Sequence, residues 1–275
     1  MLNNALLTTV LLLSVSAAHG SFIAFEAAGA ASADITATRD AFRTAVGGGT
    51  VAGANGSFGG ERREINWDGV PSAFADPNPL PANFFNINSP RGAVFSTPGT
   101  GFMVSANAGE STPVLFGFPG DFQSFSAQRL FTAVGSPITD IHFFVPGTNS
   151  AATTSAFGLI FVDVEVPDFT KLEFFDQSNA LIFSRNALVS GTRGLTFLGG
   201  MANAGEQISR VRITSGQNTL VSNGALGNLT GDVVVMDDFL YAEPTRLQRI
   251  PEPPTLALLS LGLLAVFTRR RSRAR

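Results

Sequence analysis

The sequence predicts a mainly β protein: an antiparallel β-sandwich of jelly-roll type with one short N-terminal helix and a C-terminal apolar anchor helix. In residues 21–248, short apolar runs alternate with Gly, Pro, Asn and Ser, and these turn signals recur about every 8–12 positions, as in a sandwich. One stretch, 32–46, repeats its apolar residues with helical spacing. The length between the terminal segments suits one large β domain or two small ones, and we assign residues 21–248 to one.

The composition excludes several classes of protein. Charged residues make up 14% of the 275 residues, against roughly 25% in an average soluble domain, and apolar residues make up 44%. The 29 Gly and 15 Pro show no collagen period and no low-complexity run, so the chain is neither a disordered polar tail nor a fibre. Because cysteine is absent, a disulfide framework, a zinc finger and a cysteine nucleophile are excluded.

Residues 1–20 have the pattern of a signal peptide. Residues 5–15 form an apolar run that is too short to span a bilayer. Ala18 and Gly20 supply small residues where signal peptidase reads, so Ser21 is the predicted mature start. A buried N-terminal strand or helix is the alternative, and the small residues after the run favour export.

The one helix is predicted at 32–46. Ser32 or Asp34 can cap its start, and the glycines at 47–49 end it. Its apolar face consists of Ile35, Phe42, Ala45 and Val46. A helix with one apolar face must cover an apolar surface, so we expect it to lie on a sheet or on one end of the sandwich.

Strands are expected throughout the remaining body. The weaker patterns lie at 64–67, 93–96 and 101–104. Sharper patterns lie at 114–118, 124–131, 138–144 and 158–166. A hairpin at 172–176 and 181–183 follows, and then strands at 196–199, 209–214 and 232–241.

The clearest alternation runs over 161–166. With a period of two, its three valines face the core, and Asp163 and Glu165 face outward, about 7 Å apart. Such a carboxylate pair can serve a hydrolase of polysaccharides. Arg210 and Arg212, predicted to face outward on a neighbouring strand, would more simply neutralise the pair.

The C-terminal residues 249–275 form a separate segment in three parts. Pro251, Glu252 and Pro253 begin it, and residues 255–267 are apolar. The arginines that flank the membrane follow: Arg269, Arg270, Arg271, Arg273 and Arg275. Thirteen helical residues span about 20 Å, so the predicted transmembrane helix is marginal against a hydrocarbon core of roughly 30 Å. The positive-inside rule leaves the tail in the cytoplasm and the body outside.

This order of Pro-Glu-Pro, apolar helix and Arg-rich end resembles the PEP-CTERM sorting signal of Gram-negative bacteria. The resemblance implies that an exosortase recognises Pro251, Glu252 and Pro253, cuts near them and passes the protein to the cell surface, often alongside exopolysaccharide production. The protein would then be anchored in the membrane of the cell envelope before processing, and lie at the surface or outside the cell afterwards.

Parts of the body are also similar to other surface proteins that carry this signal. These parts are residues 62–71, 88–92 and 235–239. The resemblance covers most of 34–243 and implies a lectin-like sandwich without a defined reaction.

Charge and motifs argue against several activities of the exported body. Residues 21–250 carry 13 basic and 20 acidic side chains, so the net charge near −7 disfavours nucleic-acid binding. His142 lies in a strand pattern without a nucleophile elbow, and we expect it to pair with Asp140 or a loop. The sequence contains no P-loop, dinucleotide fingerprint or paired-histidine metal motif.

Asp237 and Asp238 are the candidate metal ligands. Adjacent residues of a strand point to opposite faces, so one of these carboxylates must share a row of apolar side chains. A buried carboxylate requires an arginine, backbone donors or a cation. Calcium, which prefers oxygen ligands, is the cofactor hypothesis, and a structural salt bridge or solvation at the sheet edge is the alternative.

Trp67 lies in the densest polar cluster of the chain, at 61–68. Its ring, with Arg63 and Asp68, is the candidate ligand site, because sugar-binding proteins stack aromatic rings against pyranose rings. A buried Trp in a loop held by Arg-Glu pairs is the alternative, which we favour.

These observations predict a non-enzymatic, exported protein of the cell surface or extracellular matrix. A carbohydrate-binding module for an extracellular polysaccharide is the alternative function, and a hydrolase is a weaker third. No catalytic residue is assigned.

Overall fold

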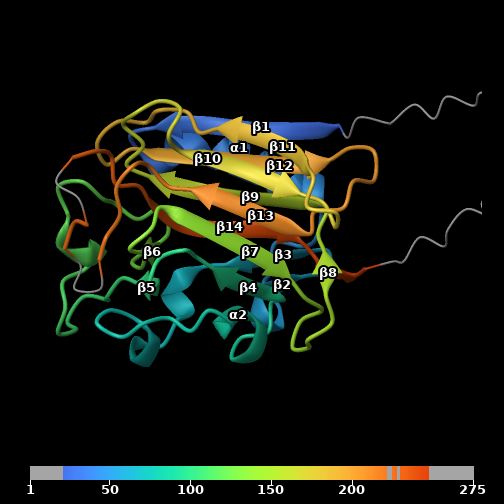
Figure 1. Ribbon diagram of the computed structural model, residues 1–275, viewed down its shortest axis with the longest axis horizontal. Coiled ribbons are helices and arrows are strands. Elements are labelled where there is room, and N and C mark those ends of the chain that lie inside the picture. The colour runs from blue at the N-terminus through green and yellow to red at the C-terminus, as the bar shows by residue number, and fades with distance from the viewer. Residues whose placement is uncertain (1–20, 222–224, 228–229, 248–275) are drawn as a thin grey trace, which may run out of the picture.

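Two antiparallel sheets pack against each other in this protein, and one helix covers the outside of the larger sheet (Figure 1). The computed structural model describes residues 21–221, 225–227 and 230–247. The predicted mainly β sandwich with an N-terminal helix is confirmed. The predicted signal peptide and C-terminal anchor helix lie outside the described residues. Within the described ranges, no helix is long and apolar enough to cross a membrane.

Eight strands form the larger sheet. Six of them follow the order β1-β12-β9-β14-β3-β2, and β6 pairs with both β14 and β5. The strands are β1 Phe22–Gly29, β2 Ser57–Phe58, β3 Arg62–Ile65, β5 Gly101–Val104, β6 Phe131–Val134, β9 Ala156–Val162, β12 Leu195–Ala202 and β14 Val235–Ala242. Every residue of β9 and β14 is buried, since the second sheet covers one face of this sheet and α1 lies against the other.

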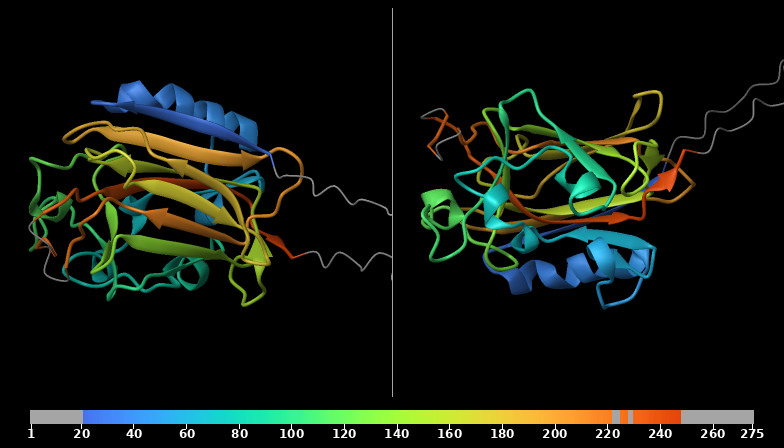
Figure 2. Two further views of the ribbon diagram at one scale, coloured as in Figure 1. Left: turned by 45° about the horizontal axis from the view of Figure 1, so that its top comes forward. Right: turned by 90° about the horizontal axis from the view of Figure 1, so that it is seen from below.

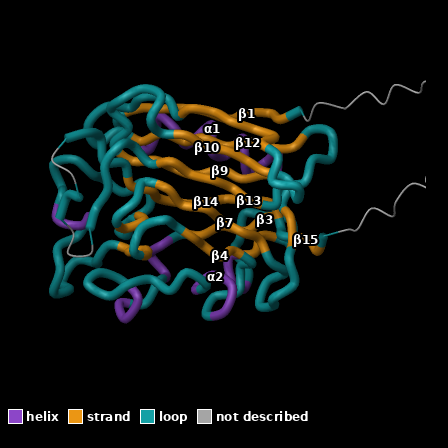
Figure 3. Tube along the Cα trace, in the orientation of Figure 1, coloured by secondary structure: helices purple, strands orange, loops and turns teal. Residues whose placement is uncertain are grey.

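Five strands form the second sheet, in the order β11-β10-β13-β7-β4. They are β4 Ala93–Ser96, β7 Ile138–Phe143, β10 Lys171–Phe175, β11 Leu181–Asn186 and β13 Arg210–Thr214. Burial alternates along β7, β10 and β13, so one face of this sheet packs on the core and the other faces solvent. A short pair, β8 Ala152–Thr153 and β15 Thr245–Arg246, lies beside the two sheets (Figure 3).

The helix α1 spans Ser32–Val46, as predicted. The Asp34 carboxylate accepts a hydrogen bond from the backbone N–H of Ala31, and Gly47 ends the helix at φ 98°. Phe42 is fully buried and packs its ring on Phe25 and Phe197 of the larger sheet, with ring centroids 5.4 and 5.6 Å away. The helix therefore forms a third layer outside that sheet (Figure 2).

The second helix α2, Phe84–Ile87, is short, and 3₁₀ turns lie at Ala54–Gly56, Trp67–Gly69, Ser72–Phe74 and Leu115–Gly117.

Most predicted strands are confirmed, and two are wrong. The turn at Leu115–Gly117 replaces the strand predicted at 114–118, because Leu115 and Phe116 adopt positive φ. The strand predicted at 124–131 is loop up to β6. The edge strand β1, which is only half-buried, has no counterpart among the predictions.

The strand predicted at 158–166 ends early, at Val162. Asp163 adopts φ 74°, outside the β region, and this turns its side chain inward, where it is 5% exposed. The predicted outward orientation of Asp163 is therefore wrong, whereas Glu165 is exposed as expected. Val164 is fully buried, also as expected.

The described chain begins and ends at the same end of the sandwich (Figures 1 and 3). Ser21 precedes β1, and β15 pairs with β8 just before β9 begins. The loops 163–170 and 187–194 lie at the other end of β9 and β12, about 20 Å away for strands of this length. We call these two loops and residues 230–232 the distal end.

Trp67 lies at the centre of the core between the sheets. Its ring is fully buried, stacks on Phe131 at 4.1 Å and meets Phe85 and Phe239 edge-on. Its Nε1–H donates to the Asp237 carbonyl at 2.9 Å. The ring offers no accessible face to a sugar, which corrects the expectation of a ligand platform at this residue. The fully buried Tyr241 likewise presents no ring surface.

We expect Trp67→Ala to lower the free energy of unfolding by about 3–5 kcal/mol, because it opens a cavity between the sheets and leaves the Asp237 carbonyl without its donor. Chemical denaturation followed by circular dichroism measures this loss. Phe169→Ala is the control, because that ring is 46% exposed and its removal should cost less than about 1 kcal/mol. A loss below about 1 kcal/mol for Trp67→Ala would contradict the core position.

Candidate functional site

The other residues of the predicted Trp67 ligand site hold loops in place. The Arg63 guanidinium forms a bidentate ion pair with Glu243, with N–O distances of 2.7 and 2.8 Å, and also donates to the carbonyls of Asn55 and Pro90. The Asp68 carboxylate accepts from the backbone N–H of Arg129 at 2.8 Å. These contacts fit the alternative that we favoured, in which ion pairs fix a loop around a buried Trp.

Asp237 and Asp238 are both buried, because the second sheet and α1 cover the two faces of β14, and a β-bulge lies at this pair. Two residues of β14 lie opposite one residue of β9 at this point, so the two side chains no longer point to strictly opposite faces. The Ser126 hydroxyl lies 3.1 Å from an oxygen of Asp237 and 2.8 Å from one of Asp238. The strand pattern required at least one of these carboxylates to lie among apolar side chains, and both are buried, since their residues are 0% and 5% exposed.

Protein donors satisfy Asp237. Its Oδ2 accepts from the backbone N–H of Phe125 at 2.6 Å and of Ser126 at 3.3 Å, and its Oδ1 accepts from the N–H of Asp238 at 2.9 Å. Burial raises the pKa of Asp237 well above its usual range, and the neighbouring Asp238 adds to the rise. These N–H groups provide the partners that a buried carboxylate requires, so Asp237 does not need a cation. Calcium ligation by Asp237 and Asp238 stays a prediction that the geometry does not favour.

His142 and Asp140 lie on the solvent-facing side of the second sheet. The His142 Nε2 is 3.4 Å from the Ser96 hydroxyl, a long contact, and burial lowers the pKa of the ring. The Asp140 carboxylate accepts from Arg210 at 2.9 Å and from Arg212 at 2.8 Å. The two arginines thus neutralise Asp140, and the prediction that they pair with Asp163 and Glu165 is wrong.

Three carboxylates meet at the distal end: Asp163, Glu165 and Asp232. One oxygen from each lies within 4.8 Å of the others. Asp163 and Asp232 are each 5% exposed, and Glu165 is exposed. This arrangement is the strongest acidic cluster in the part of the chain that the structure describes, and we call it the distal acidic cluster.

Hydrogen bonds from neighbouring loops fix each member of the distal acidic cluster. Asp163 accepts from the backbone N–H of Arg193 at 2.7 Å, and Glu165 from the Thr192 hydroxyl. The Oδ2 of Asp232 accepts from the backbone N–H of Glu165 at 3.0 Å and of the next residue at 3.2 Å. The cluster therefore joins the loops on either side of β10 and β11 to the start of β14.

Burial and the repulsion of neighbouring carboxylates raise the pKa values of Asp163 and Asp232. Burial raises the pKa of Asp163 to about 7, and the charges of Glu165, Asp232 and Asp121 add to the rise. Burial also raises the pKa of Asp232, with a smaller contribution from Glu165. A carboxylate that favours its proton near neutral pH lacks a compensating positive charge.

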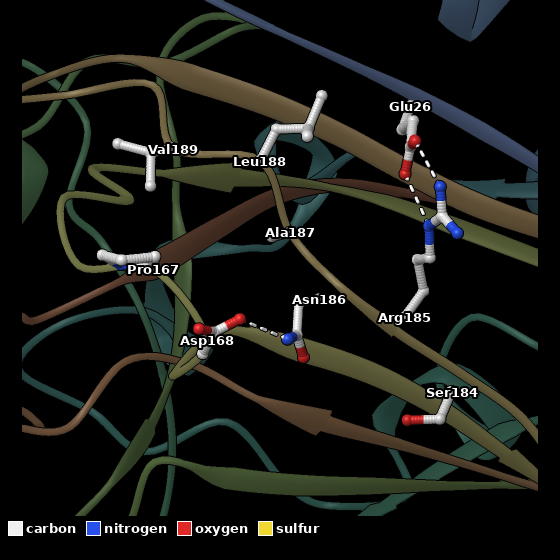
Figure 4. A pocket seen from close by; sticks show the side chains of 9 residues that line it. All are labelled: Glu26, Pro167, Asp168, Ser184, Arg185, Asn186, Ala187, Leu188 and Val189. Atoms are coloured by element: carbon white, nitrogen blue, oxygen red, sulfur yellow. Dashed lines mark hydrogen bonds and ion pairs between the residues drawn. The ribbon is translucent and has the colours of Figure 1, made fainter.

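A groove of about 610 Å³ is lined by residues of β1, β11 and the loops 163–170 and 187–194 (Figure 4). On one side of it, Glu26 of β1 and Arg185 of β11 form a bidentate ion pair at 2.6 and 2.8 Å. Asp168 accepts from the Asn186 amide at 2.7 Å. The exposed side chains of Leu188 and Val189 complete the lining. The groove thus combines planar polar groups with a small apolar surface.

The groove and the place of Asp232 in the distal acidic cluster were not predicted from the sequence. Asp232 is 67 residues from Glu165 along the chain, and nothing in its local pattern distinguishes it from a strand residue. Only the pairing of β14 with β9 brings the two together. The one signal that could point to this end of the sandwich was the acidic pair at 163 and 165.

The C-terminal residues 249–271 match the family model of the PEP-CTERM protein-sorting motif. The chain therefore carries the motif of an exosortase substrate, which implies an exported, cell-surface protein that exosortase processes. The predicted recognition residues and the first three flanking arginines fall inside this match and outside the described residues: Pro251, Glu252, Pro253, Arg269, Arg270 and Arg271. No curated protein and no solved structure matches the chain.

The ion pairs of Asp140 give a pH-dependent stability. Burial opposes the ionisation of Asp140, but Arg212 and Arg210 outweigh it, so the pKa of this carboxyl lies below its usual range. A lowered native pKa adds stability above the unfolded-state pKa of about 4, and this stability is lost as the pH falls further. We expect Asp140→Asn to cost about 1–2 kcal/mol at pH 7 and progressively less below pH 4, measured by denaturation at each pH.

The exposed pair of Glu26 and Arg185 provides the control for this prediction. Glu26→Gln should cost less than about 1 kcal/mol at pH 7, because solvent screens an exposed ion pair. A cost of Asp140→Asn that stays constant from pH 7 to pH 3 would contradict the assignment.

Proposed function

We propose that this chain is a non-enzymatic structural protein of the cell surface or extracellular matrix, a β-sandwich that exosortase delivers through its C-terminal signal. The sorting motif at 249–271 carries the proposal. The shape of the body supports it, because the described chain ends at one end of the sandwich and the loops of the distal end lie at the other. Cleavage by exosortase after residue 247 takes place at the end opposite to the distal end, so the loops of the distal end remain accessible.

The chemistry of the described residues supports a non-enzymatic role. The single histidine of the body, His142, has no carboxylate that orients it, since both oxygens of Asp140 accept from arginines. The buried pair Asp237 and Asp238 is engaged with a loop and lies away from solvent. The half-exposed His142 thus lacks an orienting carboxylate among the described residues, and the buried Asp237 and Asp238 are inaccessible to a substrate.

Mass spectrometry of the cell-surface fraction tests the delivery. We expect the surface form to begin near Ser21 and to lack peptides from 254–275, because exosortase cuts near the motif. Glu252→Ala should leave the C-terminal peptides in place and shift the protein to the membrane fraction. Arg246→Ala, an exposed change outside the motif, is the control and should be processed normally. A surface form that retains 254–275 would contradict the proposal.

The groove favours polysaccharide binding as a second candidate function. Its volume of about 610 Å³ falls in the range of small-molecule sites, roughly 300–1,000 Å³. The Glu26 and Arg185 side chains offer several donors and acceptors for sugar hydroxyls, and Leu188 and Val189 offer apolar contacts to a ring face. Strong sugar sites usually add an aromatic ring, and Phe169, next to Asp168 in sequence, is exposed.

Calorimetric titration with oligosaccharide fragments of bacterial exopolysaccharides tests this second candidate. We expect weak binding that Arg185→Ala reduces at least tenfold, because the change removes the guanidinium donors from the groove. Arg246→Ala should bind as the unaltered protein does. Trp67 fluorescence should stay constant, since that ring is buried elsewhere. Binding that is unaffected by Arg185→Ala would exclude the groove.

A further inference from the structure

We propose that the distal acidic cluster is a calcium site, in which Asp163, Glu165 and Asp232 each supply carboxylate oxygen to one ion. One oxygen from each residue lies within 4.8 Å of the other two. Calcium–oxygen bonds are about 2.3–2.6 Å long, so ligands on opposite sides of the ion lie about 4.6–5.2 Å apart. The three oxygens are thus already within the span of one coordination sphere.

An unpartnered oxygen of Asp232 points independently to a ligand. The side chain belongs to a residue that is 95% buried, since 5% is exposed, and its Oδ2 is occupied by two backbone N–H donors. Its Oδ1 is buried and has no hydrogen-bond partner among the described residues. Buried polar atoms are nearly always satisfied, because an unsatisfied one loses its hydration without replacement. A cation beside this carboxylate supplies the missing interaction.

The charge around the cluster also calls for a cation. Among the described residues, no arginine or lysine forms an ion pair with Asp163, Glu165 or Asp232. Asp121 brings a further negative charge to the vicinity of Asp163. By contrast, Asp140 on the second sheet has two arginine partners. A partly buried group of carboxylates without a counter-charge is unfavourable, and a divalent ion removes that cost.

The donor set selects calcium over other metals. The cluster consists of carboxylate oxygens, which suit a hard cation, whereas zinc prefers nitrogen and sulfur ligands. The chain has no cysteine, and His142 lies on β7 of the second sheet. Magnesium demands near-ideal octahedral geometry at about 2.0–2.1 Å, which irregular loop residues rarely supply. Calcium tolerates irregular geometry, and the exposed Glu165 leaves one side open for water ligands.

The position of the site predicts what the ion does. The three ligands come from the loop after β9 and from the residues before β14, and Thr192 and Arg193 bind two of these ligands from the loop before β12. An ion at this point therefore fixes the loops of the distal end relative to one another. The same loops carry Asp168, Leu188 and Val189 of the groove. Calcium binding stabilises this end of the sandwich whether or not the groove binds a polysaccharide.

Thermal denaturation and calorimetric titration of the full-length chain test the site. The protein is first stripped with a chelator, returned to chelator-free buffer and titrated with calcium chloride. Extracellular calcium modules have Kd values of about 10⁻⁴–10⁻³ M, and we expect a Kd in this range. At a calcium concentration roughly ten times Kd, the melting temperature should rise by about 3–6 °C. No heat and no rise up to 10 mM calcium would overturn the proposal.

Matched variants show which residues bind the calcium ion. Asp163→Asn and Asp232→Asn should weaken calcium binding at least tenfold. If either variant folds poorly, Glu165→Gln supplies the same test with an exposed residue and should weaken binding severalfold. Asp168→Asn makes the same change on the same loop outside the cluster, and it should respond to calcium like the unaltered protein. An undiminished response in the cluster variants, or an equal response to magnesium alone, would overturn the assignment.

Discussion

The fold depends on the burial of one carboxylate, Asp237, in a strand that has no solvated face. β14 lies between β9 on one side and β3 and β6 on the other, and the second sheet and α1 cover its two faces. A carboxylate in this position must find its donors within the protein. The loop that carries Phe125 and Ser126 folds onto the strand and supplies them, and the carbonyl of Asp237 accepts from Trp67. One residue thus links the central strand, a long loop and the aromatic core.

Buried charged side chains elsewhere in the body also find their partners within the protein, in ion pairs. Glu64 on β3 accepts from Arg62 and from Arg43 of α1, at 2.6–2.8 Å, and so ties the helix to the larger sheet. In a chain without cysteine, such contacts and the Phe-rich core must provide the stability that a disulfide would add elsewhere. These charged side chains therefore stabilise the contacts between elements of the fold. The distal acidic cluster differs, because its charges lack an arginine or lysine partner among the described residues.

Local patterns were sufficient to predict much of the fold. The bounds of α1 were predicted because its cap, apolar spacing and terminal glycines all lie within one short stretch. The alternation along β13 predicted which of its side chains are buried, since a period of two has one interpretation in a half-buried strand. The hairpin of β10 and β11 was equally local.

Contacts that are remote in sequence account for the errors. The loop before β6 has strand-like residues, but its N–H groups bind Asp237, more than 100 residues away, and it forms no ladder. Asp163 reads as an outward strand residue, yet a single positive φ turns it inward toward Asp232. From the sequence, calcium was expected at Asp237 and Asp238. The proposed site instead includes Asp232, which the pairing of β14 with β9 brings close to Asp163 and Glu165.

Hydrogen exchange shows whether Asp237 anchors the loop at 124–126 to the sheet. The measured quantity is the exchange rate of the backbone amides of Phe125 and Ser126, which donate to the buried carboxylate. We expect these loop amides to exchange as slowly as those of β14, through global unfolding alone. Exchange at the rate of exposed loop amides, with β14 still protected, would contradict it.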